Sequence, residues 1–164
     1  MNFNSIKEYF YRLYNICYVL VLAPLALFLF LYYESQIEKI LPIIQADDKL
    51  LKFEAIFFLV SIAGLTTVHI YVRSRLAIVR KEVGLGDKMD RYVPIALVRT
   101  AVGSFSALLM NAGFYLTGGI AFAVAFGLTM IWVGWHWPTP KRFCNDLSVR
   151  SDERELLLKS KDAF

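Results

Sequence analysis

One apolar stretch, from Ile95 to Trp137, limits what this chain can fold into more than any other feature. It has 43 residues and one formal charge, on Arg99. A helix rises about 1.5 Å per residue, and roughly 20 apolar residues cross the hydrocarbon core of a bilayer. The stretch is therefore long enough for two crossings, and the pair Gly118–Gly119 near its middle supplies a turn. We expect a transmembrane helical hairpin with spans at about 95–116 and 120–137.

Two more apolar segments precede the hairpin, at about 14–33 and 55–72. Pro24 lies near the middle of the first and predicts a kink, because proline removes a backbone hydrogen bond. The chain is 57% hydrophobic with a mean hydropathy of +0.50, which is too apolar for a soluble domain of 164 residues. The sequence therefore predicts an all-α integral membrane protein, a single domain over 1–164 with four transmembrane helices.

Lys and Arg residues divide the connections between the spans into two groups. Two precede the first span, six lie in the basic loop 73–91 and six in the tail 138–164. The loop 34–54 holds three, and the Gly-Gly turn holds none. Because cytoplasmic connections carry the excess of positive charge, we expect both termini and the basic loop to be cytoplasmic.

The ends of the helices carry further signals. The mixture of aromatic and charged residues in 1–12 predicts a short interfacial helix. The second helix is expected to continue past the membrane to about Glu82, and Pro94 to start the third span. Ser151 can cap a terminal helix over 151–162.

Small residues recur at every fourth position in the last two spans. They are Gly103 and Ala107 in the third span, and Gly119, Ala123 and Gly127 in the fourth. Small side chains at this spacing let helix backbones approach closely. We expect the third and fourth spans to pack through these residues, with contact to a partner protein or a second copy as the alternative.

A line of polar residues follows the third span, with Arg99, Ser106, Asn111 and Thr117 as its members. No acidic residue in the spans can pair with Arg99, so we expect its side chain to reach lipid headgroups or the end of the bundle. A small channel or transporter along this line is an alternative. Contacts with lipid headgroups or a partner are also expected from Arg73, Arg75, Arg80 and Lys81 of the basic loop.

His69 and His136 lie near the ends of the second and fourth spans, at a similar depth on the predicted cytoplasmic side. Two histidines on facing helices can hold a haem b as axial ligands. The competing interpretation is that both are interfacial residues among aromatic neighbours. Haem is therefore kept as an alternative, and no resident cofactor is the first expectation.

Other functional classes find little support. Cys17 and Cys144 are expected to be free thiols, and the chain has too few Cys and His residues for a metal site. No catalytic constellation and no Gly-rich phosphate loop is recognisable, so we expect no enzyme. Topology and anionic lipid explain the basic loop, so nucleic-acid binding is not expected.

The second half of the chain resembles a group of small four-span membrane proteins of Bacteroidota. The similarity lies in FYLTGGIAF (114–122), in WPTPKRFCNDLSV (137–149) and in the acidic, Leu-rich final segment around Glu153 and Leu156. It covers roughly the last 50 to 60 residues. That group often has an acid in the third span where this chain has Ser104. The resemblance implies a multi-pass protein of a bacterial inner membrane and brings no activity with it.

The first functional hypothesis is a non-enzymatic subunit or scaffold of an inner-membrane assembly, or a homo-oligomer, which associates through spans three and four. The alternatives are a b-type cytochrome with His69 and His136 as ligands, and a small channel or transporter.

Overall fold

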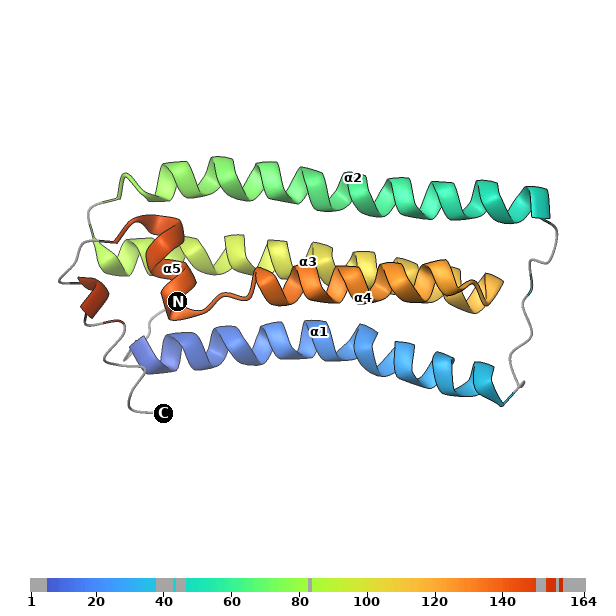
Figure 1. Ribbon diagram of the computed structural model, residues 1–164. Coiled ribbons are helices and arrows are strands. Elements are labelled where there is room, and N and C mark those ends of the chain that lie inside the picture. The colour runs from blue at the N-terminus through green and yellow to red at the C-terminus, as the bar shows by residue number, and fades with distance from the viewer. Residues whose placement is uncertain are drawn as a thin grey trace.

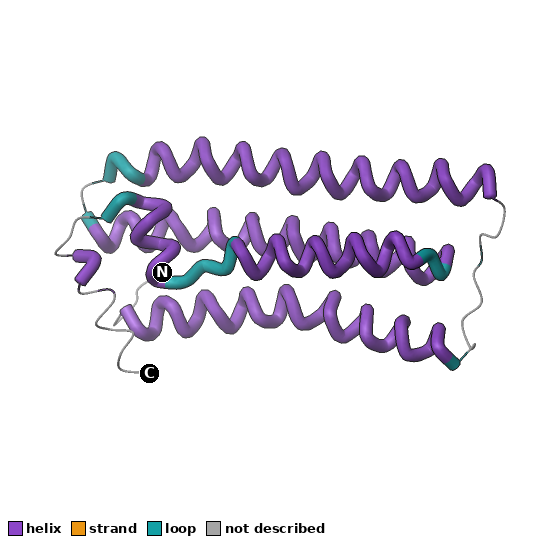
Figure 2. Tube along the Cα trace, viewed as in Figure 1, coloured by secondary structure: helices purple, strands orange, loops and turns teal. Residues whose placement is uncertain are grey.

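The computed structural model is a bundle of helices, with no strand in the part of the chain that it describes (Figure 1, Figure 2). The structure describes residues 6–37, 43, 47–82, 84–149, 153–155 and 157. The helices are α1 (Ile6–Gln36), α2 (Asp47–Val79), α3 (Leu85–Thr117), α4 (Ile120–Trp135) and α5 (Pro140–Leu147). The predicted all-α fold is confirmed.

Three of these helices, α1, α2 and α3, are each long and apolar enough to cross a membrane. The fourth candidate is shorter. At 16 residues and about 1.5 Å per residue, α4 is roughly 24 Å long, less than the approximately 30 Å hydrocarbon core. It qualifies as a span only together with α5, from which it is bent by 74°. The structure therefore has three to four helices that are able to cross a membrane.

The centre of the bundle is α3, which contacts α1, α2 and α4 (Figure 1). Half of its most apolar window is buried inside the bundle, compared with 17% for α1 and for α2. The other long helices therefore expose most of their apolar surface, as helices do when lipid is their solvent. This central position explains why the polar residues of α3 are buried.

The turn between α3 and α4 lies at the predicted glycine pair. Gly118 has a φ of 65°, in the left-handed region that glycine adopts at little cost, and its N–H donates to the Phe114 carbonyl oxygen at 2.7 Å. Gly119 then caps α4 in an extended conformation. The predicted helical hairpin is present.

Close approach of α3 and α4 depends on two glycines of α3. A Cβ atom added at Gly103 would lie 2.5 Å from Cγ2 of Val133, and one added at Gly113 would overlap the ring of Phe122. Ala107 is completely buried on the same helix. The predicted packing of small residues within the hairpin is therefore present on the α3 side.

The α4 side of the predicted small-residue set is mixed. Ala123 packs against the buried cluster around Phe122, and a Cβ at Gly119 would meet Thr117 and Glu54. A Cβ at Gly127 would meet nothing within 4 Å. No contact among the described residues therefore requires a glycine at position 127, and packing through Gly127 stays a prediction.

Several predicted helix ends differ from those observed. Residues from Ile6 onward belong to α1, so there is no separate interfacial helix there. The second helix ends at Val79, three residues before the predicted end. Pro94 lies inside α3, which starts nine residues earlier at Leu85, because the residues of that first part are held in a core. Of the predicted terminal helix 151–162, residues 153–155 and 157 are helical and the others lie outside the described residues.

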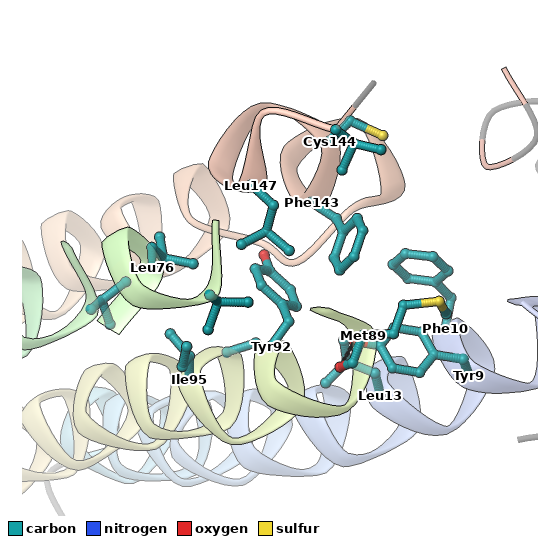
Figure 3. Packing of buried hydrophobic residues seen from close by; sticks show 14 of the residues in the cluster. Tyr9, Phe10, Leu13, Leu76, Met89, Tyr92, Ile95, Phe143, Cys144 and Leu147 are labelled. Atoms are coloured by element: carbon teal, nitrogen blue, oxygen red, sulfur yellow. Dashed lines mark hydrogen bonds between the residues drawn. The ribbon is translucent and has the colours of Figure 1, made fainter. Parts of the chain in front are cut away.

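That core occupies the end of the bundle where α1 and α3 begin, α2 ends and α5 lies (Figure 3). We call this end the basic end, because the basic loop and the basic residues of α5 lie there. The ring of Phe143 in α5 makes edge-to-face contacts with Tyr92 at 4.9 Å and with Phe10 at 6.0 Å. Tyr9 donates to the Met89 carbonyl oxygen at 2.8 Å and ties α1 to the first part of α3. The Phe143 contacts place α5 against the starts of α1 and α3, and α5 also contacts α2.

The helix α5 was not predicted from the sequence. Pro138 and Pro140 follow the fourth span and by themselves indicate only that its helix stops. Pro140 also begins α5, where its missing N–H costs nothing. The Thr139 side chain caps the helix by accepting from the Arg142 N–H. A capping threonine directly before a proline was the available signal.

Candidate functional site: a basic cavity at one end of the bundle

A cavity of about 230 Å³ opens at the basic end, between α2, α3 and α5. Its lining is dominated by charged and imidazole side chains. The lining residues are His69, Val72, Arg73, Leu76, Arg80, Arg99, His136, Arg142 and Asp146.

Arg99 lies at the buried side of this cavity. The residue is 4% exposed, and its Nη1 lies 3.5 Å from Oδ2 of Asp146. Its Nε and Nη2 are buried and have no hydrogen-bond partner within the described part of the chain. A buried donor without a partner costs on the order of 1–3 kcal/mol, and more for a charged group. Arg99 therefore has unused capacity to bind an anion.

Of the two predicted positions for the Arg99 side chain, lipid headgroups or the end of the bundle, the structure has it at the end of the bundle, where it is buried. The spans hold no acidic residue that could pair with Arg99, but its partner Asp146 comes from α5. Since α5 folds back over the end of the bundle, it covers Arg99 with an acid that is 47 residues away in the sequence.

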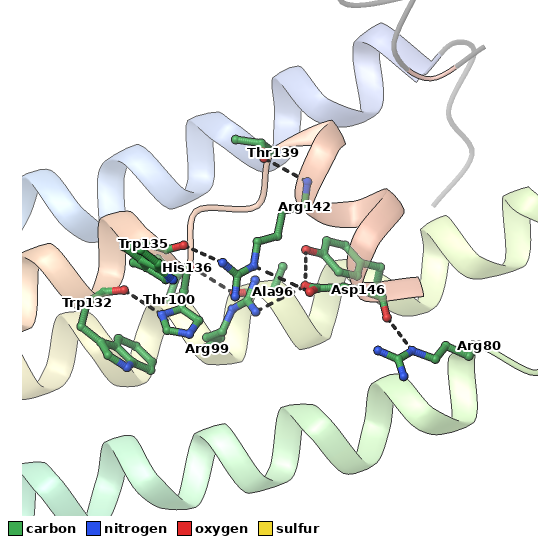
Figure 4. A network of polar contacts seen from close by, with 11 residues as sticks. Arg80, Ala96, Arg99, Thr100, Trp132, Trp135, His136, Thr139, Arg142 and Asp146 are labelled. Atoms are coloured by element: carbon green, nitrogen blue, oxygen red, sulfur yellow. Dashed lines mark hydrogen bonds and ion pairs between the residues drawn. The ribbon is translucent and has the colours of Figure 1, made fainter. Parts of the chain in front are cut away.

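Asp146 connects three elements of the basic end (Figure 4). The Tyr92 hydroxyl donates to its Oδ2 at 3.4 Å, and Nε of Arg142 lies 3.7 Å from its Oδ1. Nε of Arg80, just after α2, donates to the Asp146 backbone carbonyl oxygen at 2.7 Å. Asp146 thus joins α2, α3 and α5.

Arg142 has a second role in this network. Its Nη1 donates to the carbonyl oxygen of Trp135, the last residue of α4, at 2.7 Å. The last carbonyl groups of a helix have no partner within the helix and favour a nearby cation. Arg142 therefore ties the end of α4 to α5 and keeps its own positive charge beside the cavity.

The charges of the lining do not cancel. Four guanidinium groups face one carboxylate, which gives 4 − 1 = +3 with both histidines neutral. Guanidinium groups bind carboxylate and phosphate oxygens through well-directed N–H donors. The chemistry available in the cavity is therefore the binding of an anion.

The structure brings His69 and His136 together, with ring centroids 6.2 Å apart and nearly perpendicular ring planes. Nδ1 of His136 lies 2.9 Å from the Trp132 carbonyl oxygen. The cavity beside them, at about 230 Å³, is smaller than the roughly 300–1,000 Å³ of pockets that hold drug-sized ligands. A haem is larger than most such ligands, so a haem b does not fit between these histidines as they stand.

The predicted polar line on α3 is divided among separate contacts. Asn111 donates through Nδ2 to the Pro24 carbonyl oxygen at 2.8 Å, which links α3 to α1. Thr117 donates to the Gly113 carbonyl oxygen of its own helix. Of the line, only Arg99 lines the cavity.

The basic-loop residues are also divided. All four side chains are exposed, but Arg73 and Arg80 line the cavity, whereas Arg75 and Lys81 do not. The Arg75 guanidinium lies 5.3 Å from the centre of the Tyr71 ring.

A second, apolar feature lies farther along the bundle, between α2 and α4. This groove has a volume of about 640 Å³. Its lining residues are Phe58, Ser61, Ile62, Leu65, Met110, Ala121, Val124, Ala125, Leu128, Thr129 and Trp132. It lies within the apolar parts of the helices.

No group of three or more His, Cys, Asp or Glu residues able to hold a metal is found among the described residues. Both cysteines, Cys17 and Cys144, are free and buried. Comparisons with protein-family models, curated proteins and solved structures find no match to this chain.

Proposed function

We propose that this chain is a non-enzymatic integral membrane subunit that forms a homo-oligomer through the groove between α2 and α4. In this proposal α1 to α4 cross a bacterial inner membrane and both termini are cytoplasmic. The observation that carries the proposal is the groove itself, an apolar hollow of about 640 Å³ on a bundle of only a few helices.

The groove suits a helix better than it suits bulk lipid. Ala121 and Ala125 supply small residues one turn apart, and small residues let a second backbone come close. Ser61 and Thr129 are each about one-twentieth exposed and add polar groups to an otherwise apolar wall. Hydroxyl groups at such positions support helix association in membranes.

The occupant we propose is α4 of a second copy. Along one edge of the groove, α4 carries an apolar ridge of exposed residues spaced at three or four positions. The ridge residues are Ile120, Val124, Leu128 and Ile131, with exposures of 74%, 58%, 63% and 67%, and Val124 and Leu128 also form part of the groove wall. A ridge next to a groove is self-complementary about a two-fold axis, since each copy offers its ridge to the groove of the other. The open space at Gly127 lies on the same helix and leaves room for close approach.

The test is disulfide cross-linking in native membranes with single introduced cysteines. Leu128→Cys places a thiol in the groove, and the control Phe105→Cys places one on α3, outside the groove lining, at a similar exposure of 60%. We expect covalent dimers from Leu128→Cys and few from Phe105→Cys. Filling the groove with Ala125→Phe is expected to abolish the dimer in native mass spectrometry.

Equal cross-linking at both positions would indicate random collision and would contradict the proposal. A monomer that carries lipid, or a different protein in place of the second copy, would also contradict self-association.

Topology and charge support the proposed orientation. In the structure the start of α1, the basic loop and α5 meet at one end, so most Lys and Arg residues are on one side (Figure 1). By the positive-inside rule this is the cytoplasmic side. Contact of the exposed Arg75 and Lys81, and of the exposed parts of Arg73 and Arg80, with acidic lipid or a partner remains a prediction.

A further inference from the structure

We propose that the basic cavity binds a phosphate group, carried either by a lipid headgroup or by a free phosphate. This inference does not depend on self-association, because the cavity lies at the basic end and shares no lining residue with the groove.

Arg99 is a buried cation whose hydrogen-bond donors are only partly used. Two of its three guanidinium nitrogens have no hydrogen-bond partner among the described residues, although the residue is 4% exposed. Among the described residues its one ion pair is with Asp146, at 3.5 Å, which is longer than the approximately 2.7–2.9 Å typical of a charge-assisted hydrogen bond. Asp146 therefore satisfies Arg99 only in part.

The positively charged groups around the cavity are held in place by contacts between the helices. Arg142 is held by the Trp135 carbonyl oxygen, and Arg80 by the Asp146 carbonyl oxygen. Both contacts use neutral oxygens, which position the guanidinium groups without neutralising them. The Asp146 carboxylate, 3.7 Å from Nε of Arg142, is shared with Arg99 and offsets one positive charge in all. Three arginines from different elements therefore face one space, with one carboxylate between them (Figure 4).

The volume of the cavity and the arrangement of its hydrogen-bond donors both suit a phosphate group. A water molecule occupies about 30 Å³ of liquid, so a cavity of about 230 Å³ has room for a tetrahedral anion of several atoms. Phosphate offers several acceptor oxygens on different sides, and arginines approaching from α2, α3 and α5 match this better than they match one planar carboxylate. A phosphate group therefore fits the cavity in size, charge and donor arrangement.

The test uses the full chain in two settings. Binding of inorganic phosphate is measured by isothermal titration calorimetry in nanodiscs of phosphatidylcholine, and phosphatidic acid binding is measured by native mass spectrometry of protein released from mixed nanodiscs. Both are carried out at about 0.15 M salt, where the Debye length is about 8 Å and contacts of exposed charges are weakened.

Three variants separate the cavity from the general surface charge. Arg99→Gln is expected to weaken phosphate-group binding by roughly tenfold or more, because charge-assisted hydrogen bonds are lost. Asp146→Asn is expected to strengthen it, because the competing carboxylate disappears while an oxygen remains to accept from Tyr92. The matched control Arg75→Gln removes the same charge from an exposed position outside the cavity and is expected to change binding less than twofold.

Binding of inorganic phosphate with this pattern supports a site for free phosphate, and the same pattern with phosphatidic acid alone supports a site for a lipid headgroup. No binding in either arm would overturn the inference, and so would equal losses in Arg99→Gln and Arg75→Gln. If Arg99→Gln does not fold, phosphate-group binding by Asp146→Asn is the deciding measurement. Unchanged or weaker binding by that variant overturns the inference.

Discussion

At the residue scale, Gly113 is a position where α3 and α4 leave no room for a side chain. A Cβ there would overlap the Phe122 ring, and that ring is completely buried with Phe58 at 5.1 Å. Gly127 is its opposite: it is also helical, but a Cβ there meets nothing within 4 Å. The two positions have the same residue and secondary structure, so they form a matched pair.

We expect Gly113→Ala to destabilise the bundle by about 1–3 kcal/mol, because the Phe122 ring cannot move away without disturbing its neighbours. Gly127→Ala is expected to be neutral or to stabilise by up to about 1 kcal/mol, since alanine loses less conformational entropy in a helix. Thermal or denaturant unfolding of both variants in the same detergent measures the difference. Equal stabilities for the two variants would mean that α3 and α4 are not in contact at Gly113.

The residue types and spacings predicted some of these contacts and missed others. The spacing of Gly103 and Ala107 identified the face of α3 that contacts α4, because close helix packing needs small residues at i and i+4. The same spacing did not distinguish Gly127, since a one-dimensional pattern does not tell which side of α4 faces α3. Asp146 was missed as the partner of Arg99 because that contact depends on α5 folding back.

At the scale of elements, α5 is held by its buried apolar face rather than by its charges. Phe143, Cys144 and Leu147 are each at most 3% exposed and lie in the core at the basic end (Figure 3). Burial raises the pKa of the Cys144 thiol, so less of the reactive thiolate is present than in an exposed cysteine. The rate at which the Cys144 thiol is labelled therefore shows whether α5 is packed against the bundle.

We expect Phe143→Ala to release α5, because removal of a buried phenylalanine ring costs about 3–5 kcal/mol. Labelling of Cys144 by a maleimide should then be much faster than in the unchanged protein, as followed by mass spectrometry. The control Lys141→Ala changes an exposed residue of α5, and labelling of Cys144 should stay slow in that variant. Slow labelling in Phe143→Ala would show that the ionic contacts of Asp146 hold α5 without the aromatic core.

The long helices could be predicted from the sequence, and α5 and the helix ends could not. Runs of about 20 apolar residues identify α1, α2 and α3 independently of tertiary structure. The early start of α3 depends on contacts such as Tyr9 with Met89, which join residues 80 positions apart. Pro94 is a strong local signal for a helix start, and tertiary packing overrides it.

At the scale of the whole molecule, the basic end brings together the start of α1, the connection between α2 and α3, and α5. The other end holds the Gly118–Gly119 turn and the end of α1. A protein with this distribution of charge should adopt one orientation, with the basic end inside.

The most direct measurement is the labelling of single cysteines in spheroplasts with a membrane-impermeant maleimide. Ile37→Cys adds an exposed thiol just after α1, and Gly86→Cys adds one at the basic end, where a Cβ meets nothing within 4 Å. The native Cys17 and Cys144 are buried and give a low background. We predict that Ile37→Cys is labelled in intact spheroplasts and Gly86→Cys only after lysis. Labelling of Gly86→Cys in intact spheroplasts, or of both positions from the same side, would contradict the account.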